Sequence, residues 1–415
     1  MNSTLRRVLY FKKSCNLLNR FIRIGRQIQG LHARAPKSKE TELVKQLKAK
    51  IKLSGPLTVA EYMQEVLSNP LMGYYMNNDV FGAQGDFITS PEISQIFGEL
   101  IGIWFYERWL HYGSPKDFKF VEFGPGRGTL IADILRVFTK LGKISNALHL
   151  HLVEISPAMR EIQKKLLCTD SRYNIEKTTD DETLQTKDGI RITWHRNILD
   201  VPKGFTFYLA HEFFDALPIH QFQKTKNRWR EVMVDIDKDI NGPHHLKFCL
   251  APSNTLATVL IPKDTKGDFL EIRPQAQIIV ENMAETIQRH GGCSLIIDYG
   301  DLKCDRNTLR AFKNHQISNP LLEPGNSDLT SNVDFLQLEK EFSQNGVTTF
   351  GPTAQRYFLT AMGIDVRKQV LLKKASVEQT KNIESSYKML MNDNDMGNCF
   401  KFLAAIHGNK IPPGF

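Results

Sequence analysis

Residues 121 to 128 read VEFGPGRG, a run in which Gly124, Gly126 and Gly128 alternate with other residues, beginning two positions after Glu122. Glycine lacks a Cβ atom, so such a run permits a tight turn and lets a ligand touch the main chain. The apolar segment KFVEF leads into the run, and the helix-period segment TLIADILRVFTKL follows it. A strand, a glycine loop and a helix in this order indicate a ligand site at the edge of a parallel α/β sheet.

The spacing of the glycines and the nearby acid indicate which ligand this loop binds. A dinucleotide-binding loop has the spacing G-x-G-x-x-G, whereas this chain has G-x-G-x-G. A carboxylate at Glu122 would repel a pyrophosphate, but it suits a ligand that carries an ammonium and a sulfonium group. S-adenosylmethionine carries both. We therefore predict that Glu122, Gly124, Gly126 and Gly128 bind S-adenosylmethionine.

Two more polar residues follow later strands. Glu154 ends the apolar segment HLHLVEIS, where a ribose-binding carboxylate is expected, although NAD sites use the same device. Asn197 follows the next strand, RITWHRN, and is expected either to contact the adenine or to cap its own loop.

The end of the fourth strand, FTFYLAHEFFDALP, places Glu212 and Asp215 at the same edge of the sheet. Methyl transfer to nitrogen needs an oriented nucleophile more than covalent help from the protein. If that nucleophile is a guanidinium, carboxylates can hold its planar fork with paired hydrogen bonds. The alternative makes Asp215 the N-cap of a helix and makes Phe213 and Phe214 core residues.

Strands and helices alternate from residue 116 to 415, which predicts a doubly wound parallel α/β domain. A β-hairpin insertion with a turn at Asn241-Gly242 is expected at about residues 225–270. Residues 40–115 are predicted to form a helical N-terminal lobe. In it, Thr58 and Glu61 have the spacing of a capping box, and a helix is expected from Ser90 through about Trp109.

The positive charge of the chain is concentrated at its start. The whole chain has 54 basic and 45 acidic residues, a formal net charge of +9. Ten of the basic residues, and no acidic one, lie in residues 1–39, so the remainder is nearly neutral. This leader has the Arg-rich, amphipathic composition of a mitochondrial transit peptide; a retained basic tail is the alternative. A neutral body argues against nucleic acid as a partner.

Two further features of the sequence bear on membrane insertion and on metal binding. The chain has no run of about 18 apolar residues, so we predict no stable membrane insertion. The six cysteines form no C-x-x-C pair and no cluster spaced with histidine, so we predict no metal site.

The chain resembles the family of mitochondrial protein arginine methyltransferases that serve as assembly factors for respiratory complex I. The resemblance runs from about residue 55 to the C-terminus, and it rests on six blocks in family order: GDFITSPEISQIFGELIGIW, VEFGPGRGTL, HEFFDALP, LIIDYG, DLTSNVDF and GPTAQRYFLTAMGI. It implies a seven-strand, Rossmann-like class I methyltransferase sheet and S-adenosyl-L-methionine as methyl donor. Carried over by position, Glu122, Gly124, Gly126, Gly128 and Glu154 fall on the cofactor site.

The resemblance also implies a specific function in the mitochondrial matrix. It implies type II activity, the symmetric dimethylation of an arginine in a core matrix-arm subunit of complex I, which complex I assembly requires. A methyltransferase fold that acts as an assembly chaperone with little or no catalysis is the alternative; a nucleotide-dependent oxidoreductase lacks support, because its glycine spacing is absent.

A few positions carry open alternatives. Bacterial relatives often have Asn in place of His211 and His in place of Asn332, so either residue is a candidate for positioning the substrate. Asp298, in IDYG, is expected either to face the active site or to cap a turn. The loop that contains Asp86 and Phe87 is expected either to close over the cofactor or to pack the N-terminal helices on the sheet.

Overall fold

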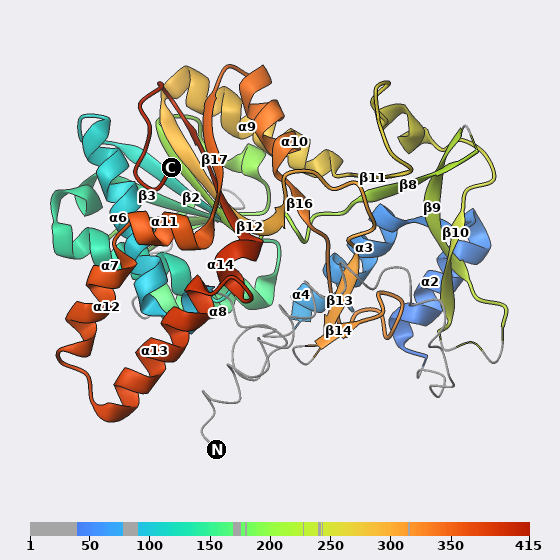
Figure 1. Cartoon of the computed structure of the whole chain (residues 1–415), viewed down its shortest axis with the longest axis horizontal. Coiled ribbons are helices and arrows are strands. Elements are labelled where there is room, and N and C mark those ends of the chain that lie inside the picture. Colours follow the sequence, from blue (N-terminus) through green and yellow to red (C-terminus); the bar gives the residue numbers. More distant parts are fainter. Residues whose placement is uncertain are drawn as a thin grey trace.

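The structure is a computed structural model that describes residues 40–77, 90–168, 176–178, 181–226, 228–239, 242, 244–313 and 316–415. The predicted transit peptide, the loop with Asp86 and Phe87, and Asn241 of the predicted turn lie outside these residues. Figure 1 shows the described elements in chain order.

A large mixed sheet organises the molecule. In order across the sheet, its strands are β17 (Thr348–Ala354), β18 (Phe400–Ile406), β12 (Gly292–Asp301), β7 (Thr206–His211), β2 (Phe118–Phe123), β3 (Leu148–Val153), β6 (Arg191–His195), β5 (Asp181–Gln185) and β4 (Glu176–Thr178). The short strand β16 (Val333–Asp334) pairs with the end of β12. Neighbouring strands from β12 to β6 are parallel, and β18 runs antiparallel to both β12 and β17. The seven strands from β17 to β6 confirm the predicted α/β class.

Strand order reverses between β2 and β7. From β2 the chain adds β3 and β6 on one side, and it then returns to add β7 and β12 on the other. In such sheets a crevice opens at the carboxyl ends of the two strands where the order reverses. The predicted glycine loop follows β2, and Glu212 follows β7, so the topology brings the two segments to one crevice.

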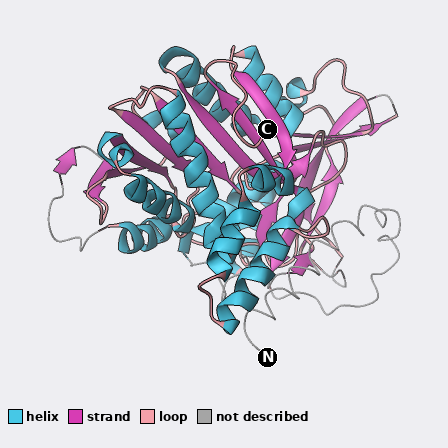
Figure 2. Ribbon diagram, turned by 60° about the vertical axis from the view of Figure 1, so that its left-hand side comes forward, coloured by secondary structure: helices cyan, strands magenta, loops and turns pink. Residues whose placement is uncertain are grey.

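Helices cover both faces of this sheet (Figure 2). One face carries α6 (Gln95–His111), α7 (Thr129–Leu141), α8 (Pro157–Leu167), α11 (Gln355–Ala361), α12 (Ile364–Leu372), α13 (Val377–Met391) and α14 (Met396–Cys399). The other face carries α9 (Pro274–His290) and α10 (Phe335–Gln344). Because both faces are buried, the inner strands are almost continuously apolar: in β2, Phe118 and Phe120 join one core while Val121 and Phe123 join the other.

A second, antiparallel sheet lies beside the first. It contains β1 (Leu57–Thr58), β8 (His220–Thr225), β9 (Arg228–Ile236), β10 (Leu246–Leu250) and β11 (Phe269–Ile272). The predicted hairpin is present as the antiparallel pair β9–β10. A three-stranded sheet, β14 (Gln316–Ser318), β13 (Arg310–Lys313) and β15 (Asp328–Thr330), was not anticipated, because its strands are too short to show a period.

The helices predicted as one N-terminal lobe divide between two cores. Helices α2 (Glu42–Ser54) and α3 (Val59–Ser68) pack with the second sheet and with β13 and β15, whereas α6 packs on the central sheet. The short helix α4 (Tyr74–Asn77) lies between them in sequence and contacts α8. The division of the chain into three domains therefore stays a prediction, and its inner boundary does not follow the packing.

Two predictions about helix starts had different outcomes. The capping box of α3 is present: Glu61 N donates to Thr58 Oγ1 at 3.1 Å, and Thr58 N donates to Glu61 Oε2 at 2.8 Å. The single helix from Ser90 to about Trp109 was wrong. Ser94 is extended (φ −156°) and its hydroxyl accepts from Ile96 N, so it ends the short helix α5 (Ser90–Ile93) and caps α6.

Candidate functional site

A cavity of about 580 Å³ opens at the carboxyl ends of β2, β3, β7 and β12. This volume lies in the usual range for small-molecule sites. Six of the predicted site residues line it: Gly124, Gly126, Glu154, Asn197, Glu212 and Asp215. The sheet thus gathers side chains and main chain from positions up to 91 residues apart, since the carboxyl ends of parallel strands share one edge.

The glycine loop has the conformation that its sequence predicts. Gly124, Gly126 and Gly128 all have positive φ, at 55°, 53° and 84°, a region that other residues rarely adopt. A Cβ atom at Gly124 would lie 3.1 Å from Cδ2 of Phe213. Gly128 does not line the cavity; it is the N-cap of α7, and its main-chain N–H donates to Pro125 O at 2.8 Å.

The Glu154 carboxylate is held by two donors beside the loop. Its Oε1 accepts from Ser156 N at 2.8 Å, and its Oε2 accepts from the side-chain amide of Gln163 at 3.2 Å. The same amide nitrogen donates to Gly126 O at 2.7 Å, and Gln163 Oε1 accepts from Trp194 Nε1 at 2.8 Å. Burial raises the pKa of Glu154. Sequence reasoning missed Gln163, which appears in PAMREIQKKL as an ordinary polar helix residue.

Glu122 does not line the cavity formed by the described residues. Strand alternation puts its side chain on the same face as Phe120, beneath α6 and α7, while Phe123 faces the cavity. The side chain is buried, and burial raises the pKa of Glu122 to about 8. Its Oε2 has no hydrogen-bond partner among the described residues. Burial therefore favours the protonated form of this carboxyl group, and its predicted contact with the cofactor stays a prediction.

Asn197 caps its own loop, which was one of the two alternatives expected from sequence. Its Oδ1 accepts from Leu199 N at 3.1 Å and so caps the 3₁₀ turn η3 (Ile198–Asp200), and the residue also lines the cavity. Direct contact with an adenine remains a prediction.

Glu212 follows β7 in a strained conformation. Its φ is 49°, and its main-chain N–H donates to Ile297 O at 3.0 Å, which locks that conformation against the next strand. Burial and the neighbouring acids Asp215 and Asp298 raise its pKa well above the ordinary value. Glu212 Oε1 is buried and has no hydrogen-bond partner among the described residues, although His211 Nε2 lies 3.4 Å away.

Asp298 organises the loop that follows Glu212. Its Oδ2 accepts from Phe214 N at 3.0 Å and from Asp215 N at 3.3 Å, so Asp298 caps this turn. Asp298 does not line the cavity. Asp215 is 5% exposed, and its Oδ2 accepts from the Tyr299 hydroxyl. The alternative role of Asp215 as a helix N-cap was wrong, because a turn and no helix follows it: Leu217 N donates to Phe214 O.

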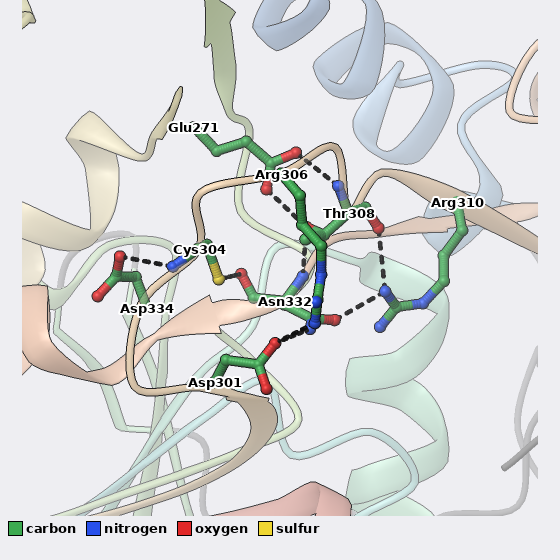
Figure 3. A network of polar contacts seen from close by, with 8 residues as sticks. All are labelled: Glu271, Asp301, Cys304, Arg306, Thr308, Arg310, Asn332 and Asp334. Atoms are coloured by element: carbon green, nitrogen blue, oxygen red, sulfur yellow. Dashed lines mark hydrogen bonds and ion pairs between the residues drawn. The ribbon is translucent and has the colours of Figure 1, made fainter. Parts of the chain in front are cut away.

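His211 and Asn332, the two candidates for positioning the substrate, have different surroundings. His211 lies between Phe97 and Phe400, with ring centroids 5.3 and 6.4 Å away, and burial lowers its pKa to about 3. Asn332 belongs to a polar network (Figure 3): its Oδ1 accepts from Arg310 Nη1 at 2.7 Å, and its Nδ2 donates to Asp301 Oδ2 at 3.1 Å.

The outer half of the cavity was not predicted. Tyr299, Arg310 and Asp328 line it, as does Tyr75, whose hydroxyl donates to Asp328 Oδ1 at 2.6 Å. Apolar side chains from α3 and α9, among them Leu67 and Ile278, complete its wall. These residues come from β12, β13, β15, α3, α4 and α9, and the short unpredicted strands among them explain why no sequence signal found this half.

Comparisons with known proteins agree with this geometry. The family model Methyltransf_28, which describes S-adenosyl-L-methionine-dependent methyltransferases, matches residues 100–353. A rat protein named "Protein arginine methyltransferase NDUFAF7, mitochondrial" is 47% identical over 382 residues, which are 90% of this chain and 86% of the rat chain. The human protein of the same name is 46% identical over 90% of this chain and 85% of its own. The chain belongs to the family of mitochondrial protein arginine methyltransferases.

A solved structure supports the fold of this methyltransferase family. A Burkholderia thailandensis protein, crystallised with S-adenosyl-homocysteine, superposes with a TM-score of 0.73 at 23% identity, over 90% of this chain and 93% of its own. The residues present here fit S-adenosyl-L-methionine, the methyl donor of the family. The positive-φ glycine loop leaves room that a Cβ would fill, and Glu154 presents a carboxylate from the second strand. None of the described helices meets the length and hydropathy needed to cross a membrane.

Proposed function

We propose that this protein transfers methyl groups from S-adenosyl-L-methionine to an arginine side chain of a protein substrate in the mitochondrion. One observation carries the proposal: the cavity lined by the glycine loop is also lined by two carboxylates, half-buried Glu212 and buried Asp215, each with one buried oxygen that has no hydrogen-bond partner among the described residues. The names of the rat and human relatives support the same substrate class.

The chemistry of these carboxylates suits a guanidinium. When bound, the methyl donor supplies an electrophilic methyl group, and the nitrogen that receives it must also lose a proton. Carboxylates that face a planar guanidinium can hold it with charge-assisted hydrogen bonds and keep one nitrogen pointed at the methyl carbon. An arriving cation also favours ionised Glu212, whose pKa is raised by burial and by the neighbouring acids. The same group can then accept the proton that leaves the nitrogen.

The proposal extends to the specific substrate. We infer type II activity, which gives symmetric dimethylarginine, on a core matrix-arm subunit of complex I, in the mitochondrial matrix and during assembly of that complex. The six sequence blocks that this chain shares with the complex I assembly family support this part, together with the Arg-rich leader.

The test uses an array of peptides that each contain one arginine, with a matched array in which lysine replaces it. Isotope-labelled methyl groups should enter the arginine array alone, and hydrolysed products should contain symmetric dimethylarginine. Glu212→Gln should lower kcat/KM by at least about 100-fold, in the range of lost acid–base catalysis. Glu281→Gln, on the exposed face of α9, is the matched control and should change little.

Two outcomes would contradict the proposal. Transfer to lysine but not to arginine would overturn the substrate class. Restoration of complex I assembly in deficient cells by a variant that binds no S-adenosyl-L-methionine would favour the assembly-chaperone alternative.

A further inference from the structure

A half-buried arginine, Arg310, lies at the wall of a cavity that we expect to bind a cationic side chain. Arg310 lines the cavity with Asp215 and Tyr299, and its Nε and Nη2 atoms are buried without hydrogen-bond partners among the described residues. A positive charge here would repel the guanidinium of a substrate, so the contacts of Arg310 should indicate another role for it.

The surrounding network holds Arg310 in one place (Figure 3). Its Nη1 donates to Asn332 Oδ1 at 2.7 Å and to Thr308 O at 2.9 Å. Thr308 is fixed in turn, because its N–H donates to Glu271 Oε1 at 2.9 Å and its hydroxyl donates to Glu271 Oε2. Asn332 N donates to Thr308 Oγ1 at 2.9 Å. This frame places the guanidinium carbon of Arg310 4.8 Å from the centroid of the Tyr299 ring.

Tyr299 connects this cation to the candidate catalytic acid. A cation over an aromatic face draws on the electron density of the ring, and it therefore makes the phenol a stronger hydrogen-bond donor. The Tyr299 hydroxyl donates to Asp215 Oδ2. A stronger donor stabilises the ionised carboxylate more than the protonated one.

Resting on the proposed function, we propose that Arg310 is a positioning residue that acts through Tyr299 to keep Asp215 ionised and aimed into the cavity. Asn332 and Thr308 hold Arg310 against the Tyr299 ring, so that its charge serves Asp215 and does not occupy the place of the substrate. This assigns a task to Asn332, whose role the sequence alone left open.

Several groups besides Arg310 act on Asp215. Burial raises its pKa, while the Tyr299 hydrogen bond and the two arginines lower it. The charged and titratable groups around it come from its own loop, from β12, from the start of α9, from β13 and from α4 with β15: Glu212, Asp298, Tyr299, Arg273, Arg310, Tyr75 and Asp328. Arg273 donates to Ser331 Oγ at 2.6 Å, so we expect it to stay in place when Arg310 is changed.

The first experiment follows the titration of Asp215 itself. The intact protein is labelled with ¹³C at the aspartate carboxyl carbon, and the Asp215 signal is assigned with Asp215→Asn. In Arg310→Met, which keeps the length and loses the charge, the Asp215 titration midpoint should move up by about 1 pH unit. Arg306→Met is the control: Arg306 pairs with Asp301 in the same network, but it is about half exposed and has no contact with Tyr299 in the structure described.

A double-mutant cycle tests the path through Tyr299. In the Tyr299→Phe background, Arg310→Met should shift the Asp215 midpoint by clearly less than it does in the wild type. Equal shifts in the two backgrounds would overturn the path through the ring, and no shift in either would overturn the proposal. Should Arg310→Met not fold, Arg310→Lys keeps the charge but loses the planar stacking, and a smaller upward shift is expected.

Activity gives an independent readout. The acidic limb of the kcat/KM–pH profile for an arginine peptide should rise with the Asp215 midpoint in Arg310→Met, while calorimetric affinity for S-adenosyl-L-methionine stays as in wild type. A matching loss of that affinity would overturn the proposed role. If wild type modifies no arginine peptide yet the NMR shift is present, the proposed function fails and the coupling between Arg310 and Asp215 stands.

Discussion

The side-chain amide of Gln163 donates to Gly126 O at 2.7 Å, which joins α8 to the glycine loop. The same nitrogen reaches Glu154, and the amide oxygen accepts from Trp194. One buried side chain therefore sets the distance between the loop and the carboxylate that line the cofactor half of the cavity.

We expect Gln163→Leu to weaken S-adenosyl-L-methionine binding by roughly 10-fold, since loss of one buried hydrogen-bond partner costs about 1–2 kcal/mol. Calorimetric titration of S-adenosyl-L-methionine into the two proteins measures this difference in affinity. Gln288→Leu, at an exposed position of α9, is the control. Wild-type affinity in Gln163→Leu would mean that the loop and Glu154 hold their positions without this amide.

Gly124→Ala should reduce cofactor affinity at least about 10-fold. The new Cβ both strains a residue with φ of 55°, which costs about 1 kcal/mol or more, and meets Phe213 in the cavity wall. Gly113→Ala is a matched control, because Gly113 also has positive φ (79°) but no atom lies within 4 Å of its added Cβ. Both variants should lose stability, but only Gly124→Ala should lose affinity for S-adenosyl-L-methionine. Equal affinity in the two variants would contradict a role of Gly124 in cofactor binding.

Glu122→Gln should become more stable relative to wild type as pH rises from about 5 to 8. The folded-state pKa of Glu122, about 8, lies above its unfolded value. Its stabilising contribution is therefore complete only below the unfolded pKa and is lost as pH rises through the folded one. The expected gain for Glu122→Gln reaches a few kcal/mol near pH 8 and should be visible in urea unfolding curves. A pH-independent difference would indicate that the buried carboxyl is ionised.

A buried histidine pair should make the protein acid-sensitive. His151 Nδ1 lies 2.8 Å from His195 Nε2, and burial, reinforced by the neighbouring His149, lowers the pKa of His151 to about 2. Because the unfolded chain takes up this proton below about pH 6.5 and the folded chain does not, stability falls as pH drops through this window. His151→Phe should lower the slope of unfolding free energy between pH 6 and 4.5 by up to about 1.4 kcal/mol per pH unit. His290→Gln, at an exposed helix end, should leave the slope unchanged; an unchanged slope in His151→Phe would mean that the folded protein also protonates His151.

Local pattern predicted those parts of the structure that depend on neighbouring residues. The strand–glycine loop–helix unit, the capping box of α3 and the hairpin of β9 and β10 each follow from spacing within a short segment. The prediction of one helix from Ser90 was wrong because the break at Ser94 has no local signal. Ser94 interrupts the helix through its own extended φ and ψ, and a serine within a helical period does not indicate such a break.

The sequence by itself determined the α/β class, the glycine loop and the acids at strand ends, because hydrophobic period, glycine conformation and strand polarity are local properties. Only the tertiary structure decided that the Glu122 side chain is buried beneath α6 and α7, that Gln163 joins the loop to Glu154, and that Arg310 stacks on Tyr299 beside Asp215. These relationships depend on contacts between segments far apart in the chain, and on burial, which sets the protonation of the acids. Neither has a trace in residue spacing.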